Sequence, residues 1–322
     1  MGESGGAPPV SIILPVRNEA ATIGAAVASC LAQDYEGEIE VVVADAMSDD
    51  GTRDVVLDLA ASHPVVLVDN PDRVTPSGLN RAIEAASGLV IVRCDAHSEL
   101  PTDYVARAVA TLDETGAANV GGIQRAVGIG AAQRAIAAAM THPLGVGNAR
   151  FHRGGRPGPV DTVYLGVFDA TALRSVGGFN EDLVRNQDYE LNIRLIEAGH
   201  TVWFDPALEV IYRPRPSLRA LARQYHDYGR WKRRVAAMHP SSLKLRQIAP
   251  PVLVVGLLIA ILLMATSLRP LGVITWLGYL GVLGIASLIE VLRRRDPAGL
   301  LVGPAIGTMH LSWGLGFLRG AG

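Results

Sequence analysis

Three long stretches without a formal charge follow one another at the C-terminal end of the sequence. Residues 249–267, 270–289 and 297–318 contain 19, 20 and 22 residues, and only seven of the 60 charged residues lie among the last 74. About 20 apolar residues span a bilayer, so we expect three transmembrane helices in a membrane domain over residues 249–322. A buried helical hairpin in a soluble core is the alternative. Five glycines and Pro304 in the third stretch also allow a re-entrant or kinked segment.

The charged residues are distributed unevenly over the rest of the chain. Residues 1–212 carry 14 basic and 28 acidic side chains, whereas residues 213–246 carry ten basic and one acidic. The positive-inside rule places the basic segment, residues 213–248, and the arginines at 293–295 in the cytoplasm, which leaves Gly322 outside. The N-terminal residues contain no basic region followed by an apolar run, so we expect no signal peptide. These features predict a multi-pass protein of the inner (cell) membrane with a cytoplasmic N-terminal domain.

Short apolar runs alternate with helical patterns in the first part of the chain, which predicts a series of βα units. The predicted strands are residues 10–16, 39–45, 65–69 and 89–95, and the predicted helices are residues 22–32, 52–62, 76–86 and 102–115. Four such units predict an α/β fold with a Rossmann-like, mostly parallel sheet. We assign it to residues 10–212, after a flexible N-terminus over residues 1–9. Ligands of such sheets bind at the carboxyl ends of the strands.

The usual phosphate-binding glycine motifs are absent after these strands. Neither G-x-G-x-x-G nor G-x-x-x-x-G-K-[ST] follows the first strand, which argues against a redox Rossmann protein and an ATPase. Instead, Asp45 and Asp95 end the second and fourth predicted strands. A carboxylate repels a bare phosphate, but it can accept a hydrogen bond from a base or ribose. It can also hold a divalent cation that neutralises a diphosphate.

Acidic and imidazole side chains alternate after the fourth predicted strand. In an extended segment Asp95, His97 and Glu99 point to one side. Two carboxylates and an imidazole, with room for phosphate oxygens, fit Mn²⁺ or Mg²⁺, and the imidazole slightly favours Mn²⁺. Alternating polar residues also occur in ordinary solvated loops, so the segment has two interpretations.

Five short motifs occur in order along the first two thirds of the chain. They are PVRNE at 15–19, Asp45 with SDDGT at 48–52, DAH at 95–97, GGF at 177–179 and NQDYE at 186–190. In this order, over residues 10–212, they resemble the motifs of inverting family-2 glycosyltransferases with the GT-A fold. The segment RQYHDYGRWK at 223–232, followed by apolar helices, is most similar to the membrane-anchored glucosyltransferases of succinoglycan-type exopolysaccharide assembly.

The resemblance implies roles for individual residues in donor and metal binding. The nucleotide-sugar pocket would be formed by Pro15, Arg17, Glu19, Asp45 and Asp95, with Asp45 at the base. Asp95 and His97 occupy the positions of the family's D-x-D metal motif, which would hold Mn²⁺ or Mg²⁺. Because His97 replaces the usual second Asp and supplies no negative charge, Glu99 would compensate. Leu79 stands where many relatives have an arginine, so Arg125 or the basic segment is the expected partner of the diphosphate.

Asp188 matches the position at which the family has its catalytic base. One carboxylate takes the proton of the acceptor hydroxyl while the nucleoside diphosphate leaves from the opposite face, and this inverts the anomeric centre. A helical pattern follows Asp188. A carboxylate that only stabilises the N-terminus of that helix is therefore the alternative.

The basic segment contains an amphipathic helical pattern over residues 217–238, which predicts a helix lying on anionic membrane lipids. A nucleic-acid patch is the other interpretation of a basic run, but its attachment to membrane segments argues against a nucleic-acid partner. By resemblance to the family's acceptor-end motif, Gln224, Arg230 and Trp231 would contact the acceptor or the diphosphate. Residues 154–159 consist of turn formers that exclude a regular element, and they form either a connecting loop or a mobile lid.

The resemblance as a whole implies a metal-dependent, inverting hexosyltransferase of cell-surface polysaccharide assembly. It would move a hexose from a UDP-sugar to a polyprenyl-linked saccharide. A polyprenyl-monophosphate sugar synthase is one alternative, but its phosphate acceptor needs no deprotonating base, so Asp188 argues against it. A catalytically inactive membrane scaffold of the same fold is the other alternative.

Overall fold

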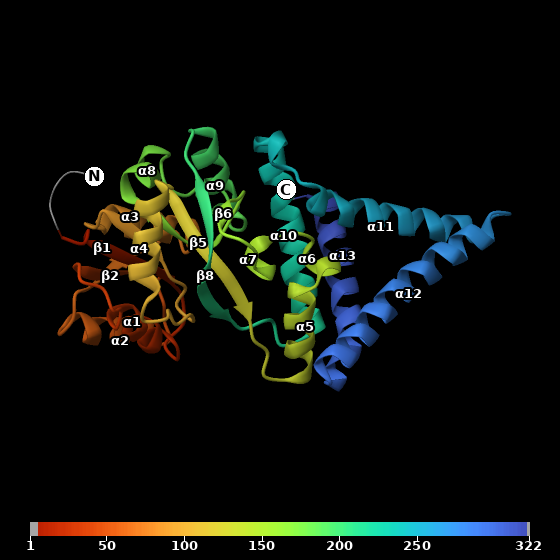
Figure 1. Cartoon of the computed structure of the whole chain (residues 1–322), viewed down its shortest axis with the longest axis horizontal. Helices are drawn as coiled ribbons and strands as arrows, with labels where there is room; N and C mark the ends of the chain where they lie inside the picture. Colours follow the sequence, from red (N-terminus) through yellow and green to blue (C-terminus); the bar gives the residue numbers. More distant parts are fainter. Residues whose placement is uncertain (1–5, 321–322) are drawn as a thin grey trace. The chain divides into compact units, whose positions relative to one another are not determined.

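The computed structural model describes residues 6–320 and consists of two compact units (Figure 1). Within the described residues, the first unit contains the chain up to Arg125 together with Gly154–Ile211, and the second contains Ala126–Arg153 and the chain from Tyr212 onward. The sequence predicted one continuous domain over residues 10–212, and the placement of Ala126–Arg153 differs from that expectation. The predicted flexible N-terminus, residues 1–9, lies partly outside the described residues.

The first unit is built on a mixed sheet that contains eight strands within the described residues. In spatial order the strands are β3 (Val65–Asp69), β2 (Ile39–Asp45), β1 (Val10–Val16), β4 (Val90–Arg93), β7 (Tyr164–Asp169), β5 (Asn119–Ala126), β8 (Val202–Tyr212) and β6 (Gly158–Pro159). β1 pairs in parallel with β2 and β4, and β2 pairs in parallel with β3. β7 is antiparallel to both β4 and β5. The predicted parallel α/β sheet is confirmed for the first four strands.

Helices cover both faces of this sheet. They are α1 (Ile23–Leu31), α2 (Thr52–Ala60), α3 (Thr75–Ala85), α4 (Tyr104–Thr115), α8 (Ala170–Ser175) and α9 (Gln187–Glu197). Successive strand residues point to opposite faces, so Ile12 and Leu14 of β1 pack in one core with α1 and α4, while Ile13 packs in another with α3 and α9. Each fully buried Ile or Leu contributes about 1.5–3 kcal/mol. The continuous apolar composition of β1 and β2 follows from this burial on both faces.

The second unit contains the elements that follow the sheet and one segment inserted from its middle. They are α5 (Ala131–Thr141), α6 (Pro143–Val146), α7 (Arg150–Arg153), α10 (Leu218–Met238), η1 (Pro240–Ser242), α11 (Leu245–Leu263), α12 (Arg269–Arg294), η2 (Pro297–Leu301) and α13 (Val302–Arg319). Ile136 of α5, Leu221 of α10 and Ile306 of α13 share one buried apolar core. Burial in this core explains why α5 belongs to the second unit.

Three helical segments of the second unit are long and apolar enough to be candidate membrane spans, as the sequence predicted. They are Leu245–Leu263, Arg269–Arg294 and Pro297–Arg319. The third consists of the short 3₁₀ helix η2 followed by α13. Each candidate therefore has the length that a bilayer requires.

The basic helix α10 forms as predicted, with Ser217 as its N-cap, but its apolar face does not point toward lipid. Leu221, Tyr225 and Val235 on that face are buried, and α13 lies so close that a Cβ on Gly229 would overlap the carbonyl of Trp313. Protein already covers this face. The prediction that α10 lies on anionic lipids through these side chains is therefore wrong.

Candidate active site

The loops that the sequence singled out meet at the carboxyl edge of the parallel strands. β1 and β2 are in register up to Val16 opposite Asp45, and Ile13 of β1 lies opposite Arg93 of β4. Because the three strands run in the same direction, the loops that follow them leave the sheet side by side. Pro15 lies in β1 opposite Ala44, and the exposed Arg17 follows that strand directly.

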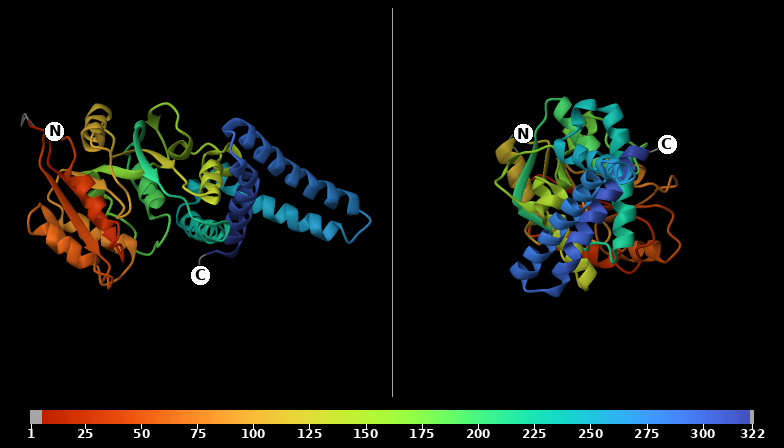
Figure 2. Two further views of the ribbon diagram at one scale, coloured as in Figure 1. Left: turned by 90° about the horizontal axis from the view of Figure 1, so that it is seen from below. Right: turned by 90° about the vertical axis from the view of Figure 1, so that its right-hand side faces the viewer.

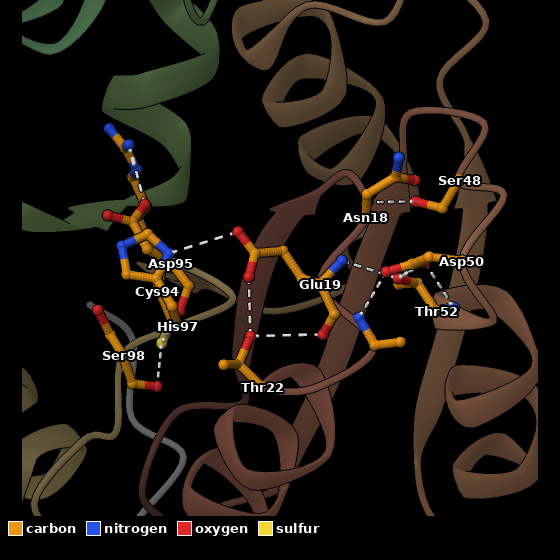
Figure 3. A network of polar contacts seen from close by, with 12 residues as sticks. Asn18, Glu19, Thr22, Ser48, Asp50, Thr52, Cys94, Asp95, His97 and Ser98 are labelled. Atoms are coloured by element: carbon orange, nitrogen blue, oxygen red, sulfur yellow. Dashed lines mark hydrogen bonds and ion pairs between the residues drawn. The ribbon is translucent and has the colours of Figure 1, made fainter. Parts of the chain in front are cut away.

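Hydrogen bonds join the loop after β1 to the loop after β2 (Figure 3). The backbone N–H of Asn18, which has a φ of 54°, donates to Ser48 Oγ at 2.9 Å, and the N–H of Glu19 donates to Thr52 Oγ1 at 2.9 Å. Asp50 Oδ2 accepts from the N–H of Ala20 at 3.1 Å. These bonds fix the loop that carries PVRNE against the SDDGT motif, which explains why SDDGT carries Ser, Asp and Thr as acceptors for backbone N–H groups.

Asp45 lies at the bottom of this edge and is fully buried. Its Oδ2 accepts hydrogen bonds from Arg53 Nη1 at 2.8 Å and from the N–H of Ser48 at 3.0 Å. The same guanidinium forms an ion pair with Asp69 at 2.8 Å, and its hydrogen bonds to the carboxylates of Asp45 and Asp69 raise the pKa of Arg53. Asp45 Oδ1 is buried with no hydrogen-bond partner among the described residues. A buried acceptor left in this way costs about 1–3 kcal/mol, and a ligand that donates to it would recover that energy.

The segment after β4 does not continue as an extended strand. β4 ends at Arg93, a turn forms at Ala96 and His97, and the N–H of Ser98 donates to the carbonyl of Asp95 at 2.9 Å. The alternation that would align Asp95, His97 and Glu99 is lost in this turn. Among residues 6–320, no three His, Cys, Asp or Glu side chains are grouped as metal ligands, so the predicted three-residue set is not assembled.

His97 lies instead beside a residue of the first loop. His97 Nδ1 is 3.8 Å from Glu19 Oε1, and Glu19 Oε2 accepts a hydrogen bond from Thr22 Oγ1 at 2.8 Å (Figure 3). Asp95, His97 and Glu19 are all partly exposed. The two loops therefore present two carboxylates and an imidazole to a ligand at this edge.

Arg93 joins the two carboxylates that the family resemblance assigns to metal binding and catalysis. Its Nη2 donates to Asp95 Oδ1 at 3.1 Å, and its Nη1 forms an ion pair with Asp188 Oδ1. Burial of the guanidinium disfavours its charge, but the charges of Asp188 and Asp95 outweigh this effect and raise the pKa of Arg93. Arg93 was not among the residues predicted from the sequence. A charged residue at the end of the apolar run Val90–Arg93 was the available signal.

The GGF motif positions the start of α9, which carries Asp188 in its first turn. The side chain of Asn80 forms two 2.8 Å hydrogen bonds with the backbone of Phe179, as acceptor from its N–H and as donor to its carbonyl. Arg194 donates to the carbonyl of Gly178 at 2.7 Å. Gly178 has a φ of +67°, and a Cβ there would lie 2.6 Å from Asn80 Oδ1. This position therefore requires glycine, and Asn80 anchors the loop that leads to Asp188.

The remaining predicted site residues make other contacts. Arg125 is exposed and pairs with Glu209 at 2.7 Å in the first unit. Gln224, Arg230 and Trp231 belong to α10 in the second unit, where Gln224 Nε2 donates to the hydroxyls of Tyr212 and Tyr228. Arg230 Nε donates to the carbonyl of Gly320 at 3.1 Å, and the guanidinium of Arg234 lies 5.6 Å from the ring of Trp231.

The turn-rich segment at 154–159 contains a short regular element, contrary to our expectation. Gly158 and Pro159 form β6, which pairs with Phe204 and Trp203 of β8. Gly154, Gly155 and Gly158 all have positive φ, so glycine is needed for this path. The strand pairing holds the end of the segment on the sheet.

Comparison with known proteins places this geometry in one family. The model of glycosyl transferase family 2 matches residues 11–176, more than half of the chain. The succinoglycan biosynthesis protein ExoA of Rhizobium meliloti is 34% identical over 320 residues, covering 96% of this chain and 93% of that protein.

Two solved structures share the fold at low sequence identity. The mannosyltransferase PcManGT from Pyrobaculum calidifontis, in complex with GDP-Man and Mn²⁺, superposes with a TM-score of 0.60 at 20% identity over 95% of this chain and 87% of that one. TarS 1–349 of S. aureus, in complex with UDP, gives 0.54 at 14% identity over 96% and 90%. The first unit therefore has the GT-A fold, and the chain belongs to glycosyl transferase family 2.

Proposed function

We propose that this family-2 glycosyltransferase moves a hexose from a UDP-sugar, with inversion, to a polyprenyl-linked saccharide in cell-surface polysaccharide assembly. One observation carries the proposal: the buried Arg93 forms ion pairs with both Asp95 and Asp188 at the carboxyl edge of the sheet. In this proposal Asp95 would serve the leaving group through a bound metal ion, and Asp188 would serve the attacking hydroxyl. The relative named for succinoglycan biosynthesis supports a role in polysaccharide assembly, and the GDP-Man and UDP complexes of the two solved structures support a nucleotide-sugar donor.

We propose that the nucleoside binds at the loops after β1 and β2. The unpaired Oδ1 of Asp45 is a buried acceptor for a base N–H, and the guanidinium of Arg53 stabilises the negative charge of the Asp45 carboxylate. Pro15, Arg17 and Glu19 would border the nucleotide, because they lie at or just after the end of β1, where Val16 is opposite Asp45. The hydrogen bonds between these two loops preorganise the pocket, which lowers the entropic cost of donor binding.

Asp95 and His97 are the proposed ligands of Mn²⁺ or Mg²⁺. Such ions are usually bound in nucleotide sites by one or two protein groups together with phosphate oxygens, so a pair of partly exposed side chains fits this chemistry. When bound, the ion would neutralise the diphosphate leaving group. Glu99 is not grouped with these two residues, and we leave it out of the proposed ligand set.

Asp188 is the proposed general base. Its side chain is 43% exposed, which leaves it accessible to an acceptor hydroxyl, while Arg93 holds its carboxylate in place. The base removes the hydroxyl proton as the oxygen attacks the anomeric carbon, and a single displacement inverts that carbon. We propose that this chemistry occurs on the cytoplasmic side of the membrane, where nucleotide sugars are available.

A donor screen tests the proposed function. The full chain in lipid nanodiscs is incubated with Mn²⁺, a lipid-linked saccharide fraction and a panel of UDP- and GDP-sugars, and nucleotide release is measured. We expect release from one UDP-hexose that depends on the acceptor fraction. Release from GDP-sugars alone would contradict the donor assignment. Transfer to polyprenyl monophosphate without a saccharide would identify a sugar synthase instead.

A further inference from the structure

The helices α11 and α12 form an antiparallel hairpin whose far end lies at residues 264–268 (Figure 1). Near this turn the helices touch, since Trp276 Nε1 donates to the carbonyl of Leu257 at 3.2 Å and a Cβ on Gly272 would overlap the carbonyl of Ala260. Toward the other end they diverge, and Figure 1 shows them as the two sides of a V. The start of α11, with Arg246, and the end of α12, with Arg294, therefore both lie at the open end.

The hairpin and α13 differ in what their surfaces can contact. Leu262, Ile274 and Leu277 of the hairpin are 70%, 63% and 63% exposed, and side chains of this kind surround both helices. An exposed apolar surface of this extent marks a membrane or protein contact, and the length and composition of the two helices fit a membrane. In α13, which the structure describes over its full length, Val302, Ile306 and Met309 are buried, and 44% of this candidate span is buried against 28% for α11 and 17% for α12.

The path of α13 leads from one arm of the V to the other. At its start, the N–H of Gly303 donates to Ser287 Oγ of α12 at 2.8 Å. Near its end, Trp313 Nε1 donates to the carbonyl of Gln247 in the first turn of α11 at 3.3 Å, and a Cβ on Gly314 would lie 2.6 Å from the carbonyl of Pro250. α13 therefore lies across the open end of the hairpin, as Figures 1 and 2 show.

This path is incompatible with a third crossing in the same direction as α11. A helix that crossed the bilayer from the charged end of α12 would finish beside the turn at residues 264–268. The last turns of α13 lie instead beside Gln247 and Pro250, at the end of α11 where the chain enters the hairpin. Both ends of α13 are thus on the side that carries the arginines.

Charged partners hold both ends of the third apolar segment. Asp296, just before η2, pairs with Arg134 of α5 at 2.7 Å. At the other end, Arg230 and Arg233 of α10 donate to the carbonyls of Gly320 and Leu318. These bonds satisfy carbonyls that the end of a helix leaves unpaired, and the charges complement its dipole. Placing an arginine in the bilayer centre costs about 2.5–3.5 kcal/mol or more, so α10 cannot accompany a crossing helix.

We propose that α13 lies in the headgroup layer of the cytoplasmic leaflet and that the chain crosses the membrane twice, through α11 and α12. Together with α5 and α10, α13 forms an interfacial platform that rests on the membrane surface and seats the hairpin. The exposed Leu245 and Leu300, together with Arg246 and Arg294 at the open end of the hairpin, supply the apolar and cationic contacts that an anionic leaflet accepts. This topology places the C-terminus in the cytoplasm. It rests on the proposed membrane insertion of the protein.

Accessibility of single cysteines to a membrane-impermeant maleimide tests this topology in the full chain. The variants are Ser267→Cys in the hairpin turn, Arg295→Cys after α12 and Gly322→Cys at the C-terminus. The unsubstituted chain is the background control, because Cys30 and Cys94 are both buried. We expect labelling of Ser267→Cys on intact cells, and labelling of Arg295→Cys and Gly322→Cys only in inverted vesicles. A C-terminal green fluorescent protein fusion, which fluoresces only when cytoplasmic, gives an independent readout and should fluoresce.

The outcomes separate this inference from the proposed function. Labelling of Gly322→Cys on intact cells, or a dark fusion, would show that α13 crosses the bilayer and would overturn the two-span topology alone. Labelling of Ser267→Cys only from the inside would show that the hairpin is not inserted. That result would also contradict the proposed membrane location of the enzyme.

Discussion

Replacing Asp188 by asparagine is expected to lower the transfer rate by roughly 10²–10⁴-fold, the usual contribution of a general base. The amide keeps the shape of the side chain and can still accept a hydrogen bond from Arg93, but it cannot take the proton of the acceptor hydroxyl. Donor affinity should therefore change little. Calorimetric titration with the UDP-sugar and a transfer assay on the same protein measure the two effects separately.

The helix-stabilising alternative for Asp188 predicts a different result. Loss of a carboxylate in the first turn of α9 costs about 0.3–1 kcal/mol of stability and leaves turnover nearly intact. Asp113→Asn, an exposed carboxylate of α4, is the matched control and should behave as the wild type in both assays. Normal binding together with near-normal turnover of Asp188→Asn would remove Asp188 from the mechanism, and Glu190 would be tested next.

The second large effect is expected at Asp95. Asp95→Ala should abolish Mn²⁺ binding and reduce the transfer rate by at least about 10²-fold. Removing a residue that only orients a metal ligand already costs about 10–100-fold in metal affinity or activity, and removing the ligand itself should cost more. Activity of the wild type should disappear in excess EDTA and return with Mn²⁺. Electron paramagnetic resonance of Mn²⁺ measures metal affinity without reference to turnover.

Two observations would speak against the metal assignment at this edge. One is full turnover of the wild type in excess EDTA, which would show that the reaction needs no divalent ion. The other is unchanged Mn²⁺ affinity in Asp95→Ala, which would place the ion elsewhere. Asp58→Ala, on the exposed surface of α2, controls for the loss of a carboxylate in the same unit.

The first strands of the fold were predictable because their residues carry local signals. β1, β2 and β3 have the predicted bounds, since each is a β-branched apolar run; β1 and most of β2 are buried, whereas β3 is a partly exposed edge strand. β4 is shorter than predicted. It ends at Arg93 instead of residue 95, because the ion pairs of Arg93 and the turn at His97 are not encoded in the local pattern. That shift separates Glu99 from the predicted metal ligands.

Individual residues of the candidate site could be predicted from the sequence, but the contacts between them could not. Asp45, Asp95 and Asp188 were identified from motifs, whereas their partners Arg53 and Arg93 were not. A motif records which residues recur in a family, while a buried ion pair between β4 and α9 depends on how distant segments pack. Asn80 anchors the loop before Asp188, but the sequence directed attention only to its neighbour Leu79.

Hydropathy predicted the membrane segments but could not distinguish burial in lipid from burial in protein. The apolar stripe of α10 and the apolar surface of α13 cover each other, so Tyr225 and Ile306 lie in a protein core. The same limitation applies to α5, whose alanine-rich face gave no signal that residues 126–153 leave the sheet domain. In each case the sequence shows that a helix has an apolar face, but it does not show which part of the protein or membrane covers that face.

The stereochemistry of the product tests the proposed mechanism most directly. The enzyme is supplied with an α-configured UDP-hexose and its lipid-linked acceptor, the glycan is released, and the new linkage is determined by proton NMR. A single displacement assisted by Asp188 predicts a β-linkage. An α-linkage formed from the same donor would mean retention, which one base and one displacement cannot produce, and it would contradict the mechanism proposed for this site.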